Sequence, residues 1–241
     1  CGASQELCAV FWALTRPKGE FVAIAPYFPE YMPFVEQTGA TFRVVPADIP
    51  DFQIDFAALE QTLNENTCAV IINSPNNPAG TVYSRRTIEK LAALLTRKSE
   101  EYGKPIYIVS DEPYRELTYG VEAPWIPSIC SDTIVCYSYS KSLSLPGERI
   151  GYVYVPGNAT ESKRLYAAIA GAARDHCAKI TAGRYDRLMA KMGKDADGFI
   201  YHRINALCEE KKVPVTVVDS MQELGKLCTV SVKTASAAVL K

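Results

Sequence analysis

The chain has 241 residues, of which 48% are hydrophobic and 22% charged, as is typical of a globular protein with a substantial core. Its formal net charge of -1 gives no general attraction to polyanions, so we do not expect a nucleic-acid partner. The apolar runs are too short to span a membrane and the first residues do not resemble an export signal, so we expect a cytoplasmic protein without a membrane partner.

Cysteine and histidine do not form any recognisable metal-binding pattern. The eight cysteines contain no C-x-x-C pair, which argues against a zinc site or a disulfide framework. His176 and His202 have no partner at metal-ligand spacing, so we expect no metal ion. Residues 2–15 already have the character of a domain interior, and we expect the natural start to lie upstream of Cys1.

Short β-rich runs alternate with amphipathic helical segments along the first two thirds of the chain. The clearest helix spans residues 85–102, with Ser84 as its N-cap, an apolar face, and Gly103 at its end. This alternation predicts an α/β fold with a mostly parallel sheet sandwiched by helices. The predicted strands are residues 21–25, 68–72, 106–110, 133–137 and 151–155.

Three polar, turn-rich segments follow three of these strands. They are N-S-P-N-N-P-A-G at residues 73–80, S-D-E-P-Y at 110–114, and Y-S-Y-S-K-S-L-S-L-P-G-E-R-I-G at 137–151. Ligands of open parallel sheets bind beyond the carboxyl ends of the strands, so these segments are where we expect a site.

In this order and spacing, the segments resemble the fold type I aminotransferases of classes I and II, over residues 2 to about 177. The resemblance implies a pyridoxal 5'-phosphate cofactor, an amino acid and a 2-oxo acid as substrates, and a homodimer with a shared active site. It also implies a large cofactor-binding domain at residues 1–157, incomplete at its beginning, followed by a connecting helical region at 158–192.

The resemblance assigns roles to a lysine amine and to the carboxylate that would pair with the cofactor's ring nitrogen. Lys141 would hold the cofactor as a Schiff base and then act as the general base, a role that requires a partly desolvated amine with a depressed pKa. Asp111 would keep the pyridine nitrogen protonated so that the ring accepts electrons. Taken alone, Lys141 would be read as a solvated surface lysine and Asp111 could be the cap of a turn, but the surrounding motif reverses the reading of Lys141.

The remaining cofactor contacts are also assigned by resemblance. Tyr114 and Asn77 would hydrogen-bond the ring hydroxyl, although a core tyrosine and a turn asparagine are the plain alternatives. Tyr27 would stack over the ring, or else serve as a hydrophobic lid. Phosphate would be bound by Ser138 and Arg149, with help from Ser140, and by backbone N–H groups at the start of a helix at Ala3 and Ser4. The family usually has small residues where Gln5 and Glu6 stand, and a carboxylate near phosphate is unfavourable.

The resemblance stops near Met192. Residues 193–241 instead resemble the C-terminal half of the bacterial ribosomal-type kink-turn RNA-binding family, through V-P-V, D-S-M-x-E-L-G and the closing A-A-V-L-K. These landmarks predict a helix, a strand, a short helix and a final strand. Without the opening half of that family we expect no RNA binding, and a truncated or wrongly joined reading frame and a natural fusion both stay open.

The motifs fix the cofactor more firmly than the reaction. The leading hypothesis is an aminotransferase, and whether the incomplete chain is active stays open. A lyase of the same fold is the alternative among enzymes, since no arginine stands in the context expected for binding a substrate carboxylate. An RNA-binding protein acting through residues 193–241 is the alternative from another class. The substrate side chain stays open.

Overall fold

The computed structural model describes residues 2–147, 149–184, 188–193, 215–218 and 236–240, with side chains described up to Arg174. The chain divides into two compact units, residues 1–173 and 174–241. In the described part of the chain, none of the helices has both the length and the apolar character needed to cross a membrane. His176 and His202, considered above as metal ligands, lie outside the described side chains.

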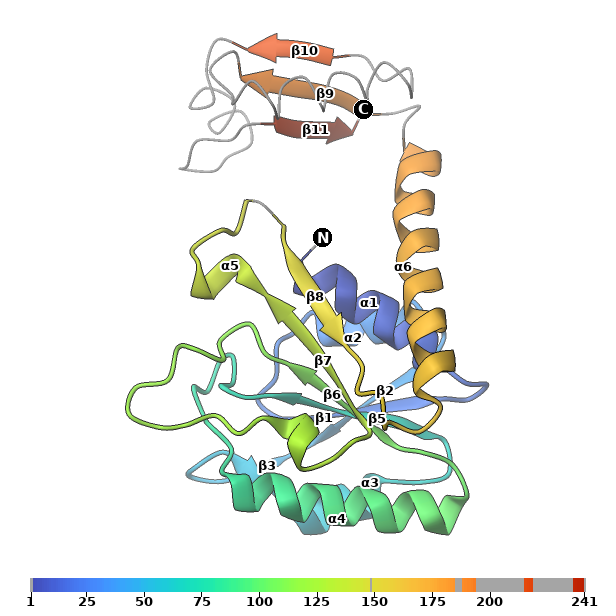
Figure 1. Ribbon diagram of the computed structural model, residues 1–241, viewed down its shortest axis with the longest axis vertical. Helices are drawn as coiled ribbons and strands as arrows, with labels where there is room; N and C mark the ends of the chain where they lie inside the picture. Colours follow the sequence, from blue (N-terminus) through green and yellow to red (C-terminus); the bar gives the residue numbers. More distant parts are fainter. Residues whose placement is uncertain (1, 148, 185–187, 194–214, 219–235, 241) are drawn as a thin grey trace. The chain divides into compact units, whose positions relative to one another are not determined.

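The first unit is built on a six-stranded sheet with the order β2-β1-β5-β6-β7-β8 (Figure 1). The first five strands of this order are parallel to their neighbours, and β8 pairs with β7 in the antiparallel direction. The prediction of a mostly parallel α/β sheet is therefore confirmed. The strands are β1 (Glu20–Ile24), β2 (Thr41–Val45), β5 (Thr67–Asn73), β6 (Tyr107–Asp111), β7 (Thr133–Ser138) and β8 (Gly151–Tyr154).

Helices cover both faces of the sheet. Successive side chains of each buried strand point to opposite faces, so each strand contributes to two core clusters. On β1, Phe21 and Ala23 join one core cluster and Val22 and Ile24 the other. Figure 1 shows the helices of the two layers on opposite sides of the sheet. The first layer contains α1 (Ala3–Leu14), α2 (Tyr31–Glu36) and the beginning of α6 (Ser162–Arg184), and the second contains α3 (Phe56–Thr62) and α4 (Arg85–Tyr102).

Helix α4 has the predicted bounds because both of its ends carry strong local signals. Ser84 Oγ accepts a hydrogen bond from the N–H of Thr87 at 3.1 Å, which satisfies one of the free donors of the first turn. Gly103 has a φ of 62°, a left-handed conformation that suits glycine at a helix end. Buried Ile88, Leu91 and Leu95 form the face packed on the sheet.

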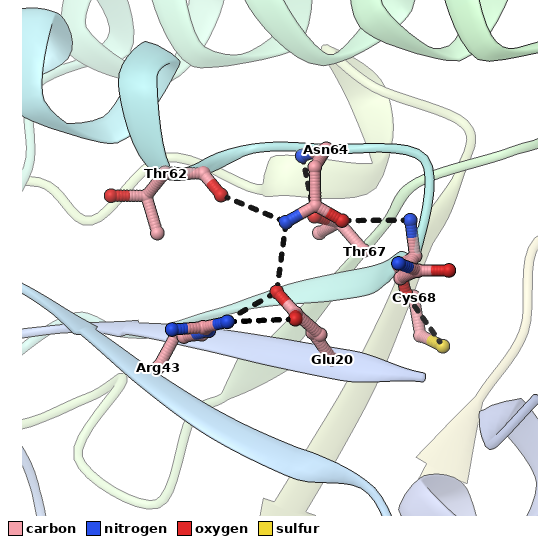
Figure 2. Close-up of polar contacts among 7 residues, drawn as sticks. Glu20, Arg43, Thr62, Asn64, Thr67 and Cys68 are labelled. Carbon is pink, nitrogen blue, oxygen red and sulfur yellow. Dashed lines mark hydrogen bonds and ion pairs between the residues drawn. The ribbon is translucent and has the colours of Figure 1, made fainter. Parts of the chain in front are cut away.

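A polar network joins three segments at the amino end of β1 (Figure 2). The guanidinium of Arg43 donates to both carboxylate oxygens of Glu20, at 3.2 and 3.0 Å, and Asn64 Nδ2 donates to Glu20 Oε2 at 2.9 Å. Burial alone would raise the pKa of Glu20, but these hydrogen bonds lower it below its usual value. The main-chain N–H of Asn64 is in turn bonded to Thr67 Oγ1, so β1, β2 and the turn before β5 are tied together.

Several elements were not foreseen from the sequence. Strand β2, helices α2 and α3, and the short antiparallel pair β3 (Ala47–Asp48) and β4 (Gln53–Ile54) all lie in the stretch between the first two predicted strands. Strand β2 is an edge of the sheet, and three of its five residues are exposed. An edge strand with this little burial lacks the continuous apolar run that reveals β1 and β5.

The second unit, residues 174–241, contains a three-stranded sheet in its described part. Strand β9 (Leu188–Gly193) lies in the centre, parallel to β10 (Val215–Val218) and antiparallel to β11 (Ser236–Leu240). Strand β11 overlaps the strand predicted at A-A-V-L-K, and β10 begins at the last residue of V-P-V. The two helices predicted for this segment lie outside the described residues.

Candidate active site

A cavity of about 330 Å³ opens beyond the carboxyl ends of β5, β6 and β7, the edge of the sheet where the sequence predicts a site. Its walls come from segments that are far apart in the sequence. The structure brings eight of the nine predicted site residues to this cavity: Ala3, Ser4, Asn77, Asp111, Tyr114, Ser138, Lys141 and Arg149.

Asp111, the last residue of β6, has a buried carboxyl group that is only half satisfied. Its Oδ2 accepts a hydrogen bond from the Tyr31 hydroxyl at 2.5 Å, whereas Oδ1 has no hydrogen-bond partner among the described residues. Burial raises the pKa of Asp111 to about 7, against the lowering effect of the bond from Tyr31. A buried, unpaired carboxylate oxygen at a cavity wall suits a cationic N–H donor.

Asn73, which the sequence analysis did not single out, connects Asp111 to the neighbouring loop. From the end of β5, its Nδ2 donates to the main-chain oxygen of Asp111 at 2.8 Å, and its Oδ1 accepts from the N–H of Asn77 at 2.6 Å. Burial and the charge of Asp111 raise the pKa of Tyr114, while a hydrogen bond with the Asn77 side chain lowers it. Asn77 and Tyr114 are therefore neighbours in the cavity wall.

Lys141 lies in the single-turn helix α5 (Tyr139–Ser142), which follows β7 directly. Ser138 caps this helix, since its Oγ accepts from the N–H of Ser140 at 3.2 Å. The ammonium group of Lys141 lies over the ring of Tyr114, 5.7 Å from the ring centre. We expected a partly desolvated amine, but the side chain is exposed, because α5 stands at the rim of the sheet and the segment after it, from Leu143 to Gly147, is itself exposed.

The amino end of α1 and Arg149 form a positively polarised corner of the cavity. Ala3 and Ser4 are the first residues of this 12-residue helix, whose opening N–H groups have no partners within the helix. Gly2, with a φ of 81°, precedes them. A Cβ atom on Gly2 would lie 2.8 Å from Arg149 Nη2, so glycine allows the guanidinium to approach the helix end. Such a corner suits a phosphate group.

Glu6, the residue that departs from the family pattern, does not line the cavity. Its side chain points towards Gly151 at the start of β8, where any larger residue would collide with it. Burial raises the pKa of Glu6 to about 7, and the negative charge of Asp111 adds to the rise while Arg149 opposes it. The repulsion that a fully ionised Glu6 would exert on a bound phosphate is thereby reduced near neutral pH.

Tyr27 is the predicted site residue that the structure does not bring to the cavity. Its ring packs edge-on against Phe42 of β2, with ring centres 5.1 Å apart, as part of the core. The aromatic residue that lines the cavity is its neighbour, Phe28. The A-P-Y-F segment does place an aromatic ring at the cavity, but sequence alone does not tell which of two adjacent rings points inward. Tyr31 gave no signal at all.

The fold and the site together define an α/β domain with an anion-binding corner, a buried carboxylate and a lysine around one cavity. The model of the family "Aminotransferase class I and II" matches residues 1–190, and the chain belongs to this family. A second model, of the "Ribosomal protein L7Ae/L30e/S12e/Gadd45 family", matches residues 192–241.

Curated relatives agree with the first assignment. The probable N-acetyl-LL-diaminopimelate aminotransferase of Bacillus subtilis is 34% identical over 156 residues, which cover 64% of this chain and 38% of that protein. The aspartate aminotransferase of Thermotoga maritima is 37% identical, over 63% of this chain and 40% of the relative. The chain thus spans about two fifths of the length of these relatives.

Solved structures give the same fold. An aminotransferase from Eubacterium rectale superposes with a TM-score of 0.72 and 56% identity, over 73% of this chain and 44% of that one. The aspartate aminotransferase of Thermus thermophilus with maleate gives a TM-score of 0.64 and 27% identity, with the same shares of the two chains.

Proposed function

We propose that the cavity binds pyridoxal 5'-phosphate and that the protein transfers amino groups between an amino acid and a 2-oxo acid. The observation that carries the proposal is the unpaired, buried Oδ1 of Asp111 in the same cavity as Lys141. A heterocyclic N–H⁺ is the kind of donor that this oxygen lacks, and an aldehyde is the group that a lysine amine captures. The residues present therefore fit the cofactor.

Each part of the cofactor has residues suited to hold it. Arg149, Ser138 and the amino end of α1 would bind the phosphate, and Asn77 and Tyr114 would hydrogen-bond the ring hydroxyl. Phe28 offers an apolar surface for the ring in place of Tyr27. Bound pyridoxal phosphate supplies an electron-accepting ring that stabilises negative charge at the α-carbon of an amino acid.

The chemical steps left to the protein are proton transfers. Asp111 would keep a proton on the ring nitrogen through Oδ1, since a carboxylate in a low-dielectric site stabilises an adjacent cation strongly. Lys141 would hold the cofactor covalently and, once a substrate amine has replaced its amine, would take the proton from the substrate α-carbon. Its exposed position at the cavity rim leaves it room to move between these two tasks.

The relatives suggest the kind of substrate and the setting. Their names specify aspartate and N-acetyl-LL-diaminopimelate, and we infer an amino acid and a 2-oxo acid as the substrate classes here. By the same family relationship we propose a cytoplasmic homodimer. A lyase of the same fold is the alternative, and it would release ammonia without any amino acceptor, whereas a transaminase stalls after one half-reaction.

Reductive trapping tests the proposal directly. Pyridoxal phosphate added to the full chain should give a visible absorption band, and borohydride should then fix one cofactor to the protein. We expect Lys141→Ala to reduce the trapped yield at least tenfold, because no other described amine lies at the cavity. Peptide mapping by mass spectrometry should place the adduct on Lys141.

A matched control is provided by Lys104, which precedes β6 at the opposite edge of the sheet. Lys104→Ala should trap the cofactor as well as the unaltered chain does. Equal trapping by Lys141→Ala and by the unaltered chain would show that the amine has been assigned wrongly. Addition of a 2-oxo acid separates the two reactions, since only a transaminase needs it for turnover.

A further inference from the structure

Tyr31 is a buried tyrosine whose hydroxyl group hydrogen-bonds the carboxyl group of Asp111. It is the first residue of α2 and is 1% exposed. Its hydroxyl donates to Asp111 Oδ2 at 2.5 Å, across 80 positions of sequence. An O–H···O⁻ bond of this length is short and charge-assisted, the stronger class of hydrogen bonds.

The same short segment connects Tyr31 to the cavity wall. The main-chain N–H of Tyr31 donates to the oxygen of Phe28 at 3.1 Å, and the two rings pack edge to face with centres 5.5 Å apart. Phe28 lines the cavity. The turn between Phe28 and Tyr31 therefore places an aromatic wall and the hydroxyl that holds Asp111 in a fixed relation to each other.

We propose that Tyr31 is a positioning residue that fixes the carboxyl group of Asp111, occupying Oδ2 so that Oδ1 alone is left for the cofactor nitrogen. The inference rests on the proposed function for the identity of that occupant. Asp111 is held at both ends, since Asn73 binds its main-chain oxygen at 2.8 Å and Tyr31 binds its side chain. With the carboxyl rotation fixed, the direction in which Oδ1 can accept is also fixed.

Tyr31 also opposes the effect of burial on Asp111. Burial favours the protonated acid, which would be a poor partner for a cationic nitrogen, while a donor on Oδ2 favours the carboxylate. Without the hydroxyl, the pKa of Asp111 should rise further. Among the described residues, other titratable groups whose charges interact with Asp111 are Glu6 on α1, Glu112 next to it in the chain, Tyr114 in the following loop and Cys136 on β7.

The first test needs no cofactor. In the full chain labelled with ¹³C-aspartate, the carboxyl resonance of Asp111, assigned by its loss in Asp111→Asn, reports its titration. We expect Tyr31→Phe to raise the midpoint by about one pH unit or more, because a hydrogen bond to a charged group is lost. Tyr83→Phe is the matched control, since Tyr83 is equally buried but belongs to the core cluster on the other face of the sheet.

The second test uses ring-¹⁵N-labelled pyridoxal phosphate, whose nitrogen resonance reports whether the ring is protonated. We expect Tyr31→Phe to keep the adduct at Lys141 but to lower the pH at which the ring nitrogen loses its proton. Cofactor affinity should fall about tenfold, as one hydrogen bond to a charge would predict. In an Asp111→Asn background, the substitution at Tyr31 should have no further effect.

Failure of the positioning role of Tyr31 and failure of the proposed function give different results. Unchanged titration of Asp111 in Tyr31→Phe overturns the positioning role. If the unaltered chain traps no cofactor at Lys141, the proposed function fails, and the cofactor-free titration still decides whether Tyr31 governs Asp111. Should Tyr31→Phe not fold, 3-fluorotyrosine at position 31 keeps the ring and strengthens the donor, so the midpoint of Asp111 should move down. No movement there would also overturn the proposal.

Discussion

Two carboxyl groups near the cavity, those of half-buried Glu6 and buried Asp111, each have one buried oxygen without a hydrogen-bond partner among the described residues. Burial raises the pKa of each to about 7. Their charges repel each other, so ionising one makes the other harder to ionise. A cationic ligand next to Asp111 would favour the ionised form of that carboxyl group.

This arrangement predicts how the stability of the cofactor-free protein depends on pH. The folded pKa of Asp111 lies above the unfolded value, so the fold disfavours the ionised form, and stability is lost as the pH rises from about 4 to about 7. Asp111→Asn should remove the share of the loss that belongs to Asp111, which is about 4 kcal/mol over the whole range and about 3 kcal/mol above pH 5, while the share of Glu6 remains. Urea unfolding at pH 5 and pH 8 measures it.

The control for this experiment is Glu65→Gln, which changes an exposed carboxylate. It should lose as much stability between the two pH values as the unaltered chain does. A wild-type stability that rises from pH 5 to pH 8, with Asp111→Asn showing the same rise, would contradict the prediction.

At the level of elements, the ends of α4 were predictable because their causes are local. We expect Ser84→Ala to lower the free energy of unfolding by about 1 kcal/mol, since the free N–H of Thr87 loses its partner. Ser84→Asp should keep the cap and most of the stability. Chemical denaturation at neutral pH measures both variants, and equal stability of Ser84→Ala and the unaltered chain would show that solvent replaces the cap.

The elements that were missed have causes that are not local. Strand β2 is held by pairing with β1 and by the bond from Arg43 to Glu20, neither of which is visible in its own five residues. The family resemblance, by contrast, selected nine residues of which eight line one cavity, and most of these stand at or soon after the end of a strand. The choice between Tyr27 and Phe28, and the contact of Tyr31 with Asp111, depend on packing between distant segments.

On the scale of the whole molecule, residues 192–241 match a family of ribosomal proteins, and this raises the question of a second activity. Acidic and basic residues are nearly balanced in this segment, so release of counterions from a bound polyanion would contribute little. We expect no retention of a kink-turn RNA by the full chain at about 50 mM salt in a gel-shift assay. Retention that weakens steeply by about 200 mM would contradict this.

The polar network of Glu20, Arg43 and Asn64 stands at the rim of the sheet opposite to Lys141. This network, which ties β1, β2 and the turn before β5 together, is thus separate in space from the lysine that would react with a cofactor. A variant of this protein that lacks Lys141 or Arg149 could therefore still fold. For this chain, solubility and a cooperative melting curve would accordingly be no substitute for an assay.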